Sequence, residues 1–87
     1  MKFVKVYIVY SYVIIPYEGA TDATHGVFFN RNDAIEYCQK LAPTICDAEW
    51  KVFSKENADS YENTDFMMRA TDGCYDYECL VREFDVL

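Results

Sequence analysis

The sequence predicts an α+β domain in which a small antiparallel sheet of three to four strands packs with about two helices. Three observations lead to this fold class. Residues 2–15 alternate as a strand does, residues 31–42 follow a helix-capping residue with helical spacing, and residues 75–87 alternate again. The last segment is a natural neighbour for the first. Because a chain of 87 residues builds only one core, we expect a single domain spanning residues 1–87.

The first element is expected to be a long strand over residues 2–15. Its even positions are all apolar or aromatic from Val4 onward, and its odd positions are mixed. An odd face this apolar indicates a central strand covered on its second side, or a strand in a subunit interface. Pro16 should end the strand, because proline removes a ladder donor. A polar loop over residues 17–26 and a short antiparallel strand over residues 27–29 should follow.

A helix is expected over residues 31–42, directly before a proline. Asn30 is a suitable N-cap, and Asp33 places a negative charge in the first turn. Glu36 and Lys40 have the i, i+4 spacing of an exposed ion pair. Four residues form the apolar stripe that should face the core: Ala34, Ile35, Cys38 and Leu41.

The middle of the chain gives mixed signals. Residues 44–47 resemble a helix-capping pattern, whereas residues 49–55 alternate well enough to form a strand. We expect a helical or irregular start followed by a short extended piece. Capping residues from Ser60 onward then predict a second helix over residues 61–70, which the turn at residues 71–73 should end.

Acidic residues are concentrated in the second half of the chain. Residues 1–43 hold four acids and four bases, whereas residues 44–87 hold eleven acids and four bases, so the net charge of −7 belongs to the second half. A surface of this kind attracts basic partners and repels nucleic acid. No apolar run reaches the roughly 18 residues of a membrane span, and no signal-peptide pattern is present. We therefore expect a cytoplasmic protein with no membrane partner.

The four cysteines predict neither a metal site nor a redox motif. Their spacings lack the C-x-x-C pattern, and the single histidine, His25, is remote from them in sequence. In an intracellular protein such cysteines are expected to be reduced and to serve as small buried apolar residues. A contact between Cys74 and Cys79 across a bend stays open. We expect no cofactor.

Four runs of the chain have a layout found in other small proteins: VYIVY at residues 6–10, HGVFF at 25–29, NRNDAIEYC at 30–38 and YECLVREFDV at 77–86. Their order of strand, G-V-F strand, helix and acidic alternating strand resembles that of small phage and prophage accessory proteins. The resemblance implies a small α+β sandwich, with residues 44–74 as an insertion that carries any specific activity. It also implies an inhibitor of host defence, such as an anti-CRISPR protein, that works in the host-cell cytoplasm.

The first functional hypothesis is a non-enzymatic inhibitor whose carboxylates mimic nucleic acid. Such a surface would block a basic nucleic-acid-processing protein, such as a Cas nuclease, without binding nucleic acid itself. Tyrosine and phenylalanine among the acids would anchor the contact. The expected contact residues are Glu56, Asp59, Tyr61, Glu62, Asp65, Phe66, Asp72, Tyr75, Asp76 and Glu78. The alternative is that the acidity only keeps the protein in solution.

Two further hypotheses are chemical. His25 would serve as a general base oriented by Asp22 or by a C-terminal acid, but no serine or cysteine nucleophile signature accompanies it. Asp59, Glu62 and Asp65 follow helical spacing that would suit a cation, but they lack the glycine and alternating acids of an EF-hand loop. We therefore expect no catalytic residue and no metal ligand.

The alternative to an inhibitor is a homo-oligomeric interaction domain. The mixed odd face of the first strand and an excess of tyrosine suit an isologous dimer formed through sheet faces or edges. The tyrosines concerned are Tyr7, Tyr10, Tyr12 and Tyr17. Packing of these side chains in the protein's own core is the competing explanation.

Overall fold

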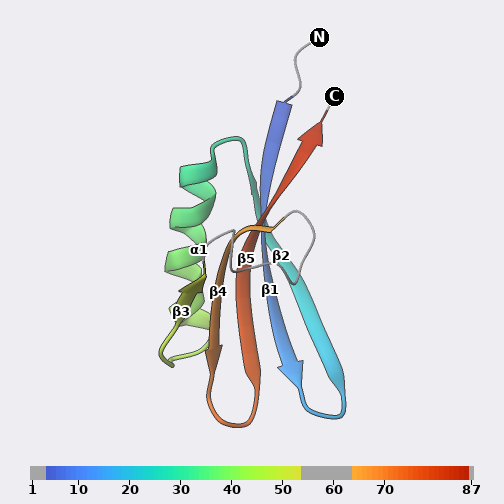
Figure 1. Cartoon of the computed structure of the whole chain (residues 1–87), viewed down its shortest axis with the longest axis vertical. Coiled ribbons are helices and arrows are strands. Elements are labelled where there is room, and N and C mark those ends of the chain that lie inside the picture. Colours follow the sequence, from blue (N-terminus) through green and yellow to red (C-terminus); the bar gives the residue numbers. More distant parts are fainter. Residues whose placement is uncertain (1–3, 54–63, 87) are drawn as a thin grey trace.

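The computed structural model describes residues 4–53 and 64–86, which form one antiparallel sheet and one helix (Figure 1). The elements are β1 (Val4–Ile15), β2 (Gly19–Phe28), α1 (Arg31–Ile45), β3 (Lys51–Phe53), β4 (Thr64–Thr71) and β5 (Asp76–Val86). The strand order is β2-β1-β5-β4-β3, and every neighbouring pair is antiparallel. The predicted pairing of the first and last segments, β1 and β5, is confirmed.

The predicted fold class of three to four strands with about two helices is wrong, because the described residues form five strands and one helix. The expected second helix over residues 61–70 is strand β4 in its described part. Phe66 and Met68 of β4 face the helix, and Met67 between them packs on the opposite face. A strand buried on both faces shows no polar alternation, so the capping residues before it were the stronger local signal and favoured a helix.

The polar loop expected over residues 17–26 is wrong as well, since β2 occupies most of it. Only residues 16–18 form the turn, in which the Glu18 amide donates to the carbonyl of Ile15 at 3.1 Å. Gly19 has a φ of 95°, a left-handed conformation that glycine adopts without strain. β2 is an exposed edge strand, and without a buried face it carries no apolar signal.

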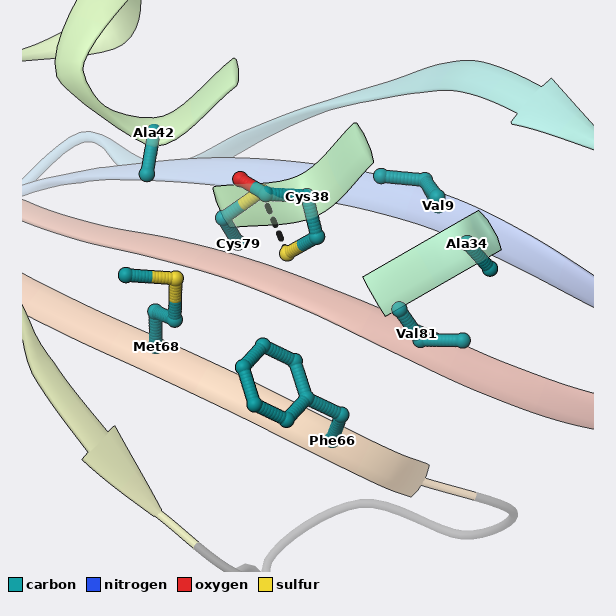
Figure 2. Close-up of a cluster of buried hydrophobic side chains, with 8 residues drawn as sticks. All are labelled: Val9, Ala34, Cys38, Ala42, Phe66, Met68, Cys79 and Val81. Carbon is teal, nitrogen blue, oxygen red and sulfur yellow. Dashed lines mark hydrogen bonds between the residues drawn. The ribbon is translucent and has the colours of Figure 1, made fainter. Parts of the chain in front are cut away.

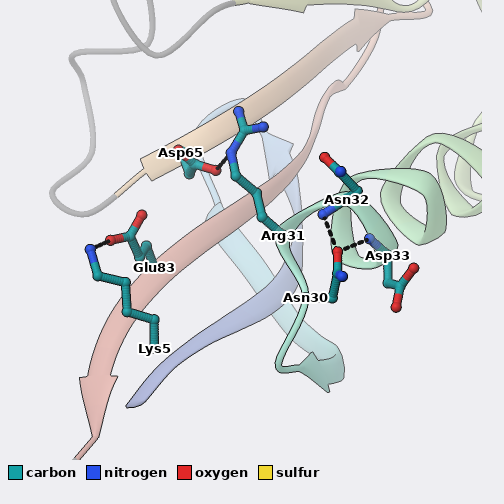
Figure 3. A network of polar contacts seen from close by, with 7 residues as sticks. All are labelled: Lys5, Asn30, Arg31, Asn32, Asp33, Asp65 and Glu83. Atoms are coloured by element: carbon teal, nitrogen blue, oxygen red, sulfur yellow. Dashed lines mark hydrogen bonds and ion pairs between the residues drawn. The ribbon is translucent and has the colours of Figure 1, made fainter. Parts of the chain in front are cut away.

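Helix α1 begins where the sequence predicted and ends later. The Asn30 side chain accepts hydrogen bonds from the amides of Asn32 and Asp33, as expected of an N-cap (Figure 3). The helix then continues through Pro43 to Ile45 instead of ending at residue 42. The proline falls in the last turn, where few intrahelical bonds remain to be broken, and the Cys46 amide still reaches the carbonyl of Ala42 at 3.3 Å.

Small side chains let the helix lie close to the sheet. Ala34, Cys38 and Ala42 are spaced by four residues along α1, and all three are fully buried. They face a layer of sheet residues that Figure 2 shows together: Val9, Phe66, Met68, Cys79 and Val81. Close-packed apolar burial of this kind is the main stabilising term for a domain of this size.

The sheet face opposite α1 is also apolar at its centre. Met67 and Leu80 are buried there beside Tyr10, Tyr12 and Phe53. The guanidinium of Arg82 lies over the rings of Tyr10 and Tyr12, 5.1 and 5.9 Å from their centroids, which is cation–π distance. These two tyrosines therefore belong to the packing of the chain's own sheet.

Candidate functional site

Chain topology brings three connections to one end of the sheet. β1 and β2 are joined there by the turn at residues 16–18, and β4 and β5 by the turn at residues 72–75. Helix α1 runs antiparallel to β2, so its C-terminus and the connection to β3 lie at the same end (Figure 1, lower end). Segments that are distant in sequence therefore share one end of the molecule.

This end carries exposed carboxylates, and the nearest bases, Lys51 and Arg69, lie just outside the segments that supply them. Its acids are Glu18, Asp47, Glu49, Asp72 and Asp76, and all five are exposed; we call this set the acidic end. The segments that supply it, residues 12–30, 41–50 and 70–77, contain neither lysine nor arginine. Asp22 lies farther along β2 and is exposed too. The five carboxylates outnumber Lys51 and Arg69, and Arg69 is already paired with Glu78, so this end has a net negative potential.

The β4–β5 turn is held by one of these acids. Asp72 Oδ1 accepts hydrogen bonds from the amides of Cys74 and Tyr75, both at 2.8 Å, and its Oδ2 accepts from the Tyr77 hydroxyl at 2.9 Å. Gly73 adopts a φ of 92°, which favours glycine at this point of the turn. The turn thus presents its exposed residues, including Tyr75 and Asp76, from a fixed backbone.

The same contacts shift the pKa values of Asp72 and Tyr77. Hydrogen bonds from the Tyr75 and Cys74 amides, and then from the Tyr77 hydroxyl, lower the pKa of Asp72. The bond to Asp72 and partial desolvation raise the pKa of Tyr77 to about 12. Desolvation and the nearby carboxylates Asp72 and Asp47 raise the pKa of Cys46. Asp72 therefore stays ionised at neutral pH, and the Cys46 thiol stays protonated.

Carboxylates in the body of the sheet are used within the fold. Asp65 is 5% exposed and pairs with Arg31, and Glu78 is 2% exposed and pairs with Arg69 across β4 and β5, Nε to Oε2 3.2 Å. Figure 3 shows the Arg31 pair together with a further ion pair between strands β1 and β5. Lys40 pairs with Glu36 on the helix surface, as the sequence predicted. Four described bases are thus each bound to a carboxylate outside the acidic end.

The structure separates the contact residues expected from sequence into three groups. Phe66 packs in the core beneath α1, and Asp65 and Glu78 are buried in the ion pairs described above. Asp72, Tyr75 and Asp76 are exposed at the β4–β5 turn. Glu56, Asp59, Tyr61 and Glu62 lie outside the described residues.

Three acids of this end were missed by sequence reasoning. Glu18, Asp47 and Glu49 join the expected Asp72 and Asp76 only because strand β2 and helix α1 return the chain to the same end. These acids could have been found from the chain topology. If the polar stretch after Pro16 is read as a strand, the antiparallel order of the elements places the β1–β2 turn, the α1–β3 connection and the β4–β5 turn at the same end.

The histidine considered as a general base has a structural partner. His25 Nε2 lies 2.6 Å from the Ser11 hydroxyl, which belongs to a buried residue of β1. Asp22 pairs in register with Tyr12, next along β1 from Ser11, so it points to the opposite face of the sheet from that hydroxyl. The structure therefore does not bring Asp22 to His25, and the His25 contact satisfies a buried hydroxyl.

The hypothesis of a carboxylate metal site finds little support in the described residues. Asp65 contacts Arg31, and the other two proposed ligands, Asp59 and Glu62, lie outside the described residues. Among the residues described, no three His, Cys, Asp or Glu side chains gather closely enough to hold a metal ion. A shallow groove of about 220 Å³ is lined by Glu49 and Asp76 of the acidic end together with the bases Lys51 and Arg69.

Comparison with protein-family models, with curated proteins and with solved structures finds no match to this chain. The similarity to phage accessory proteins therefore stays a prediction. In the part of the chain that the structure describes, no helix has the length and apolar character needed to cross a membrane.

Proposed function

We propose that this chain is a non-enzymatic, phage-encoded inhibitor that binds a basic nucleic-acid-processing protein of the host cytoplasm. A CRISPR–Cas nuclease is the candidate partner. The acidic end occupies the surface on which that protein would bind the phosphates of nucleic acid. No cofactor or metal takes part, and the inhibitor itself binds neither nucleic acid nor membrane.

The observation that supports this proposal is the separation of paired and available carboxylates. The buried acids Asp65 and Glu78 are bound to arginines of the fold. The five acids of the acidic end are exposed, and their segments lack lysine and arginine. A lysine- and arginine-lined groove binds phosphates through many such charge contacts, and a rigid set of carboxylates can take their place.

Tyr75 supplies an anchor within this charged surface. Its side chain is 42% exposed, and its amide is bonded to Asp72, so the aromatic ring projects from a held turn. Tyrosine is frequent at the energetic centre of interfaces, because it buries a large area and retains a hydroxyl for hydrogen bonding. The carboxylates of the acidic end would therefore attract a basic partner over a distance, and burial of the Tyr75 ring would add binding free energy on contact.

Charge reversal at two positions tests the proposal. The variant Glu49→Lys with Asp76→Lys should lose capture of basic nuclease from a CRISPR-carrying lysate, and should no longer compete with labelled DNA for that purified nuclease. The control Glu36→Lys with Asp85→Lys changes the net charge equally at exposed residues away from the acidic end. Neither pair includes Asp72, because that residue holds the turn.

The two variants give a clear decision. Loss of competition in the acidic-end variant alone supports recognition by this surface, and capture should weaken as salt rises, because exposed charges are screened. An equal loss of competition in both variants would show that only the net charge of the protein matters, and not the acidic end. Undiminished competition in both would contradict the nucleic-acid-mimic mechanism.

A second candidate function, a homo-oligomeric interaction domain, is favoured by the position of β2 at one edge of the sheet that the described residues form. This strand has ten residues, lies at the end of the strand order, and has a single charged side chain, Asp22. Exposed edges with few charges invite pairing with another strand. The opposite edge is the three-residue β3, which begins with Lys51 and offers little to pair with. Light scattering across protein concentrations distinguishes a monomer from a dimer of twice the mass. An Ala23→Pro variant should abolish a dimer that forms by pairing of β2 edges, because proline removes a ladder donor.

A further inference from the structure

Two cysteines that are distant in sequence meet in the core. Cys38 lies on α1 and Cys79 on the central strand β5, 41 positions later, and their sulfur atoms are 3.0 Å apart (Figure 2). Both side chains are fully buried. Sequence spacing suggested only a contact between Cys74 and Cys79, and the structure joins Cys79 to a different partner.

We propose that Cys38 and Cys79 are a disulfide-forming pair that fastens helix α1 to strand β5. The two thiols are free in the structure and already in contact, so bond formation needs a shift of about 1 Å to reach the usual S–S length. The neighbours of Cys38 along the helix are small, with Ala34 and Ala42 one turn to either side, and the cluster also holds the flexible side chain of Met68. Methionine adapts its shape readily to such a shift.

Formation of the bond requires an oxidant, which we take to be a small disulfide such as oxidised glutathione. The Cys38 thiolate attacks one sulfur of that disulfide, forms a mixed disulfide and releases one glutathione thiolate. The Cys79 thiolate then attacks the Cys38 sulfur, which forms the protein disulfide and releases the second glutathione. The protein loses two electrons and two protons, and the glutathione disulfide gains both to become two thiols.

Burial controls when this reaction takes place. The contact with Cys79 and desolvation raise the pKa of Cys38, so its thiolate is scarce in the folded state. Oxidation should therefore be slow in the folded protein and fast when helix α1 has not yet packed on the sheet. Once closed, the bond should be resistant to reduction for the same reason, since a reductant cannot reach it.

The two remaining cysteines provide a clean background for the test. Cys46 and Cys74 are partly or fully exposed, and the variant Cys46→Ser with Cys74→Ser leaves only the buried pair. This variant is unfolded and refolded in glutathione redox buffers at low protein concentration. Free thiols are counted, the intact mass is measured, the cross-linked peptides are identified, and melting is followed with and without reductant.

We expect both thiols to disappear in the oxidising buffer with the loss of two hydrogen atoms per chain. The melting temperature should rise by about 10 °C, because the bond closes a long loop in the unfolded state, and reductant under unfolding conditions should reverse the rise. The variant Cys38→Ala in the same background should keep one free thiol and show no redox-dependent melting. It serves as the control for effects of the buffer.

Three results would overturn the inference. Two free thiols after refolding in the oxidising buffer would show that the contact cannot close. A cross-link within one chain that fails to raise the melting temperature would show that the bond does not fit the fold. A disulfide between two chains would show that the sulfurs prefer another partner. None of these results depends on the proposed inhibitor function.

Discussion

The acidic end and the body of the sheet use the same side chains for different purposes. In the body, Asp65 and Glu78 are buried and each is bound to an arginine, so their charge is balanced within the fold. At the acidic end, carboxylates such as Glu49 and Asp76 are exposed in segments without lysine or arginine. A buried charge must be paired to be tolerated, whereas an exposed charge is solvated and stays available to a partner. Location, and not residue type, decides which acids can serve binding.

The largest expected effect comes from removing a base that pairs with a buried acid. Arg69→Ala should lower the free energy of unfolding by about 2 kcal/mol, because Glu78 is 2% exposed and loses a charged partner. The value lies below that of a fully buried pair, since the Arg69 side chain is 47% exposed. Urea denaturation measures the change.

Lys40→Ala is the matched control for that experiment. It also removes a base from an ion pair, but its partner Glu36 is exposed, so the free energy of unfolding should change much less than in Arg69→Ala. Equal effects of the two substitutions would remove the distinction between paired acids of the body and solvated acids of the surface.

A smaller effect is expected from reversing charge at the acidic end. Glu49→Lys with Asp76→Lys should change the free energy of unfolding by no more than about 0.5 kcal/mol, because both side chains are exposed and solvated. Adding salt should reduce the difference between the variant and the native chain. A clear loss of stability would show that these acids are part of the fold.

The smallest effect concerns titration of the β4–β5 turn. Tyr77→Phe removes a hydrogen bond to Asp72, so the lowered pKa of Asp72 should move up toward its ordinary value in carbon-detected NMR titrations. An unchanged pKa would show that the Cys74 and Tyr75 amides alone stabilise the carboxylate.

The two shifts affect the turn at opposite ends of the pH scale. Asp72 has a lower pKa in the folded chain, so its contribution is present above the unfolded value and is lost as pH falls through the folded one. Tyr77 has a pKa raised to about 12, so its contribution is present below the unfolded value near 10 and is lost as pH rises through about 12. Both groups are solvent-accessible, and the effect on global stability should be small.

The sequence predicted some strands better than others, because the strands differ in which of their two faces are buried. β1 and β5 were recognised because long runs alternate between two kinds of side chain. β2 was predicted only at its end, as a short antiparallel strand over residues 27–29, because the rest of it is exposed on an edge. β4 was missed because Phe66 and Met67 are buried on opposite faces. Alternation is visible only when one face is buried and the other is not.

The candidate site was predicted in part. The acids of the β4–β5 turn were expected to be exposed, and Asp72 and Asp76 are. Asp65 and Glu78 were expected on the same surface, but their buried positions depend on Arg31 and Arg69, which approach from other elements. Sequence shows how many acids a segment has, and does not show which of them a distant arginine will pair with.

The sequence by itself determined the local features of this protein: the alternation of β1 and β5, the cap of α1 at Asn30, and an acidic second half. Each depends on neighbouring residues alone. Tertiary structure decided the five-strand order, the contact of Cys38 with Cys79, and the collection of exposed acids at one end. These features depend on which strands pair and on where the helix packs, and both are fixed by burial of apolar surface between segments far apart in the chain.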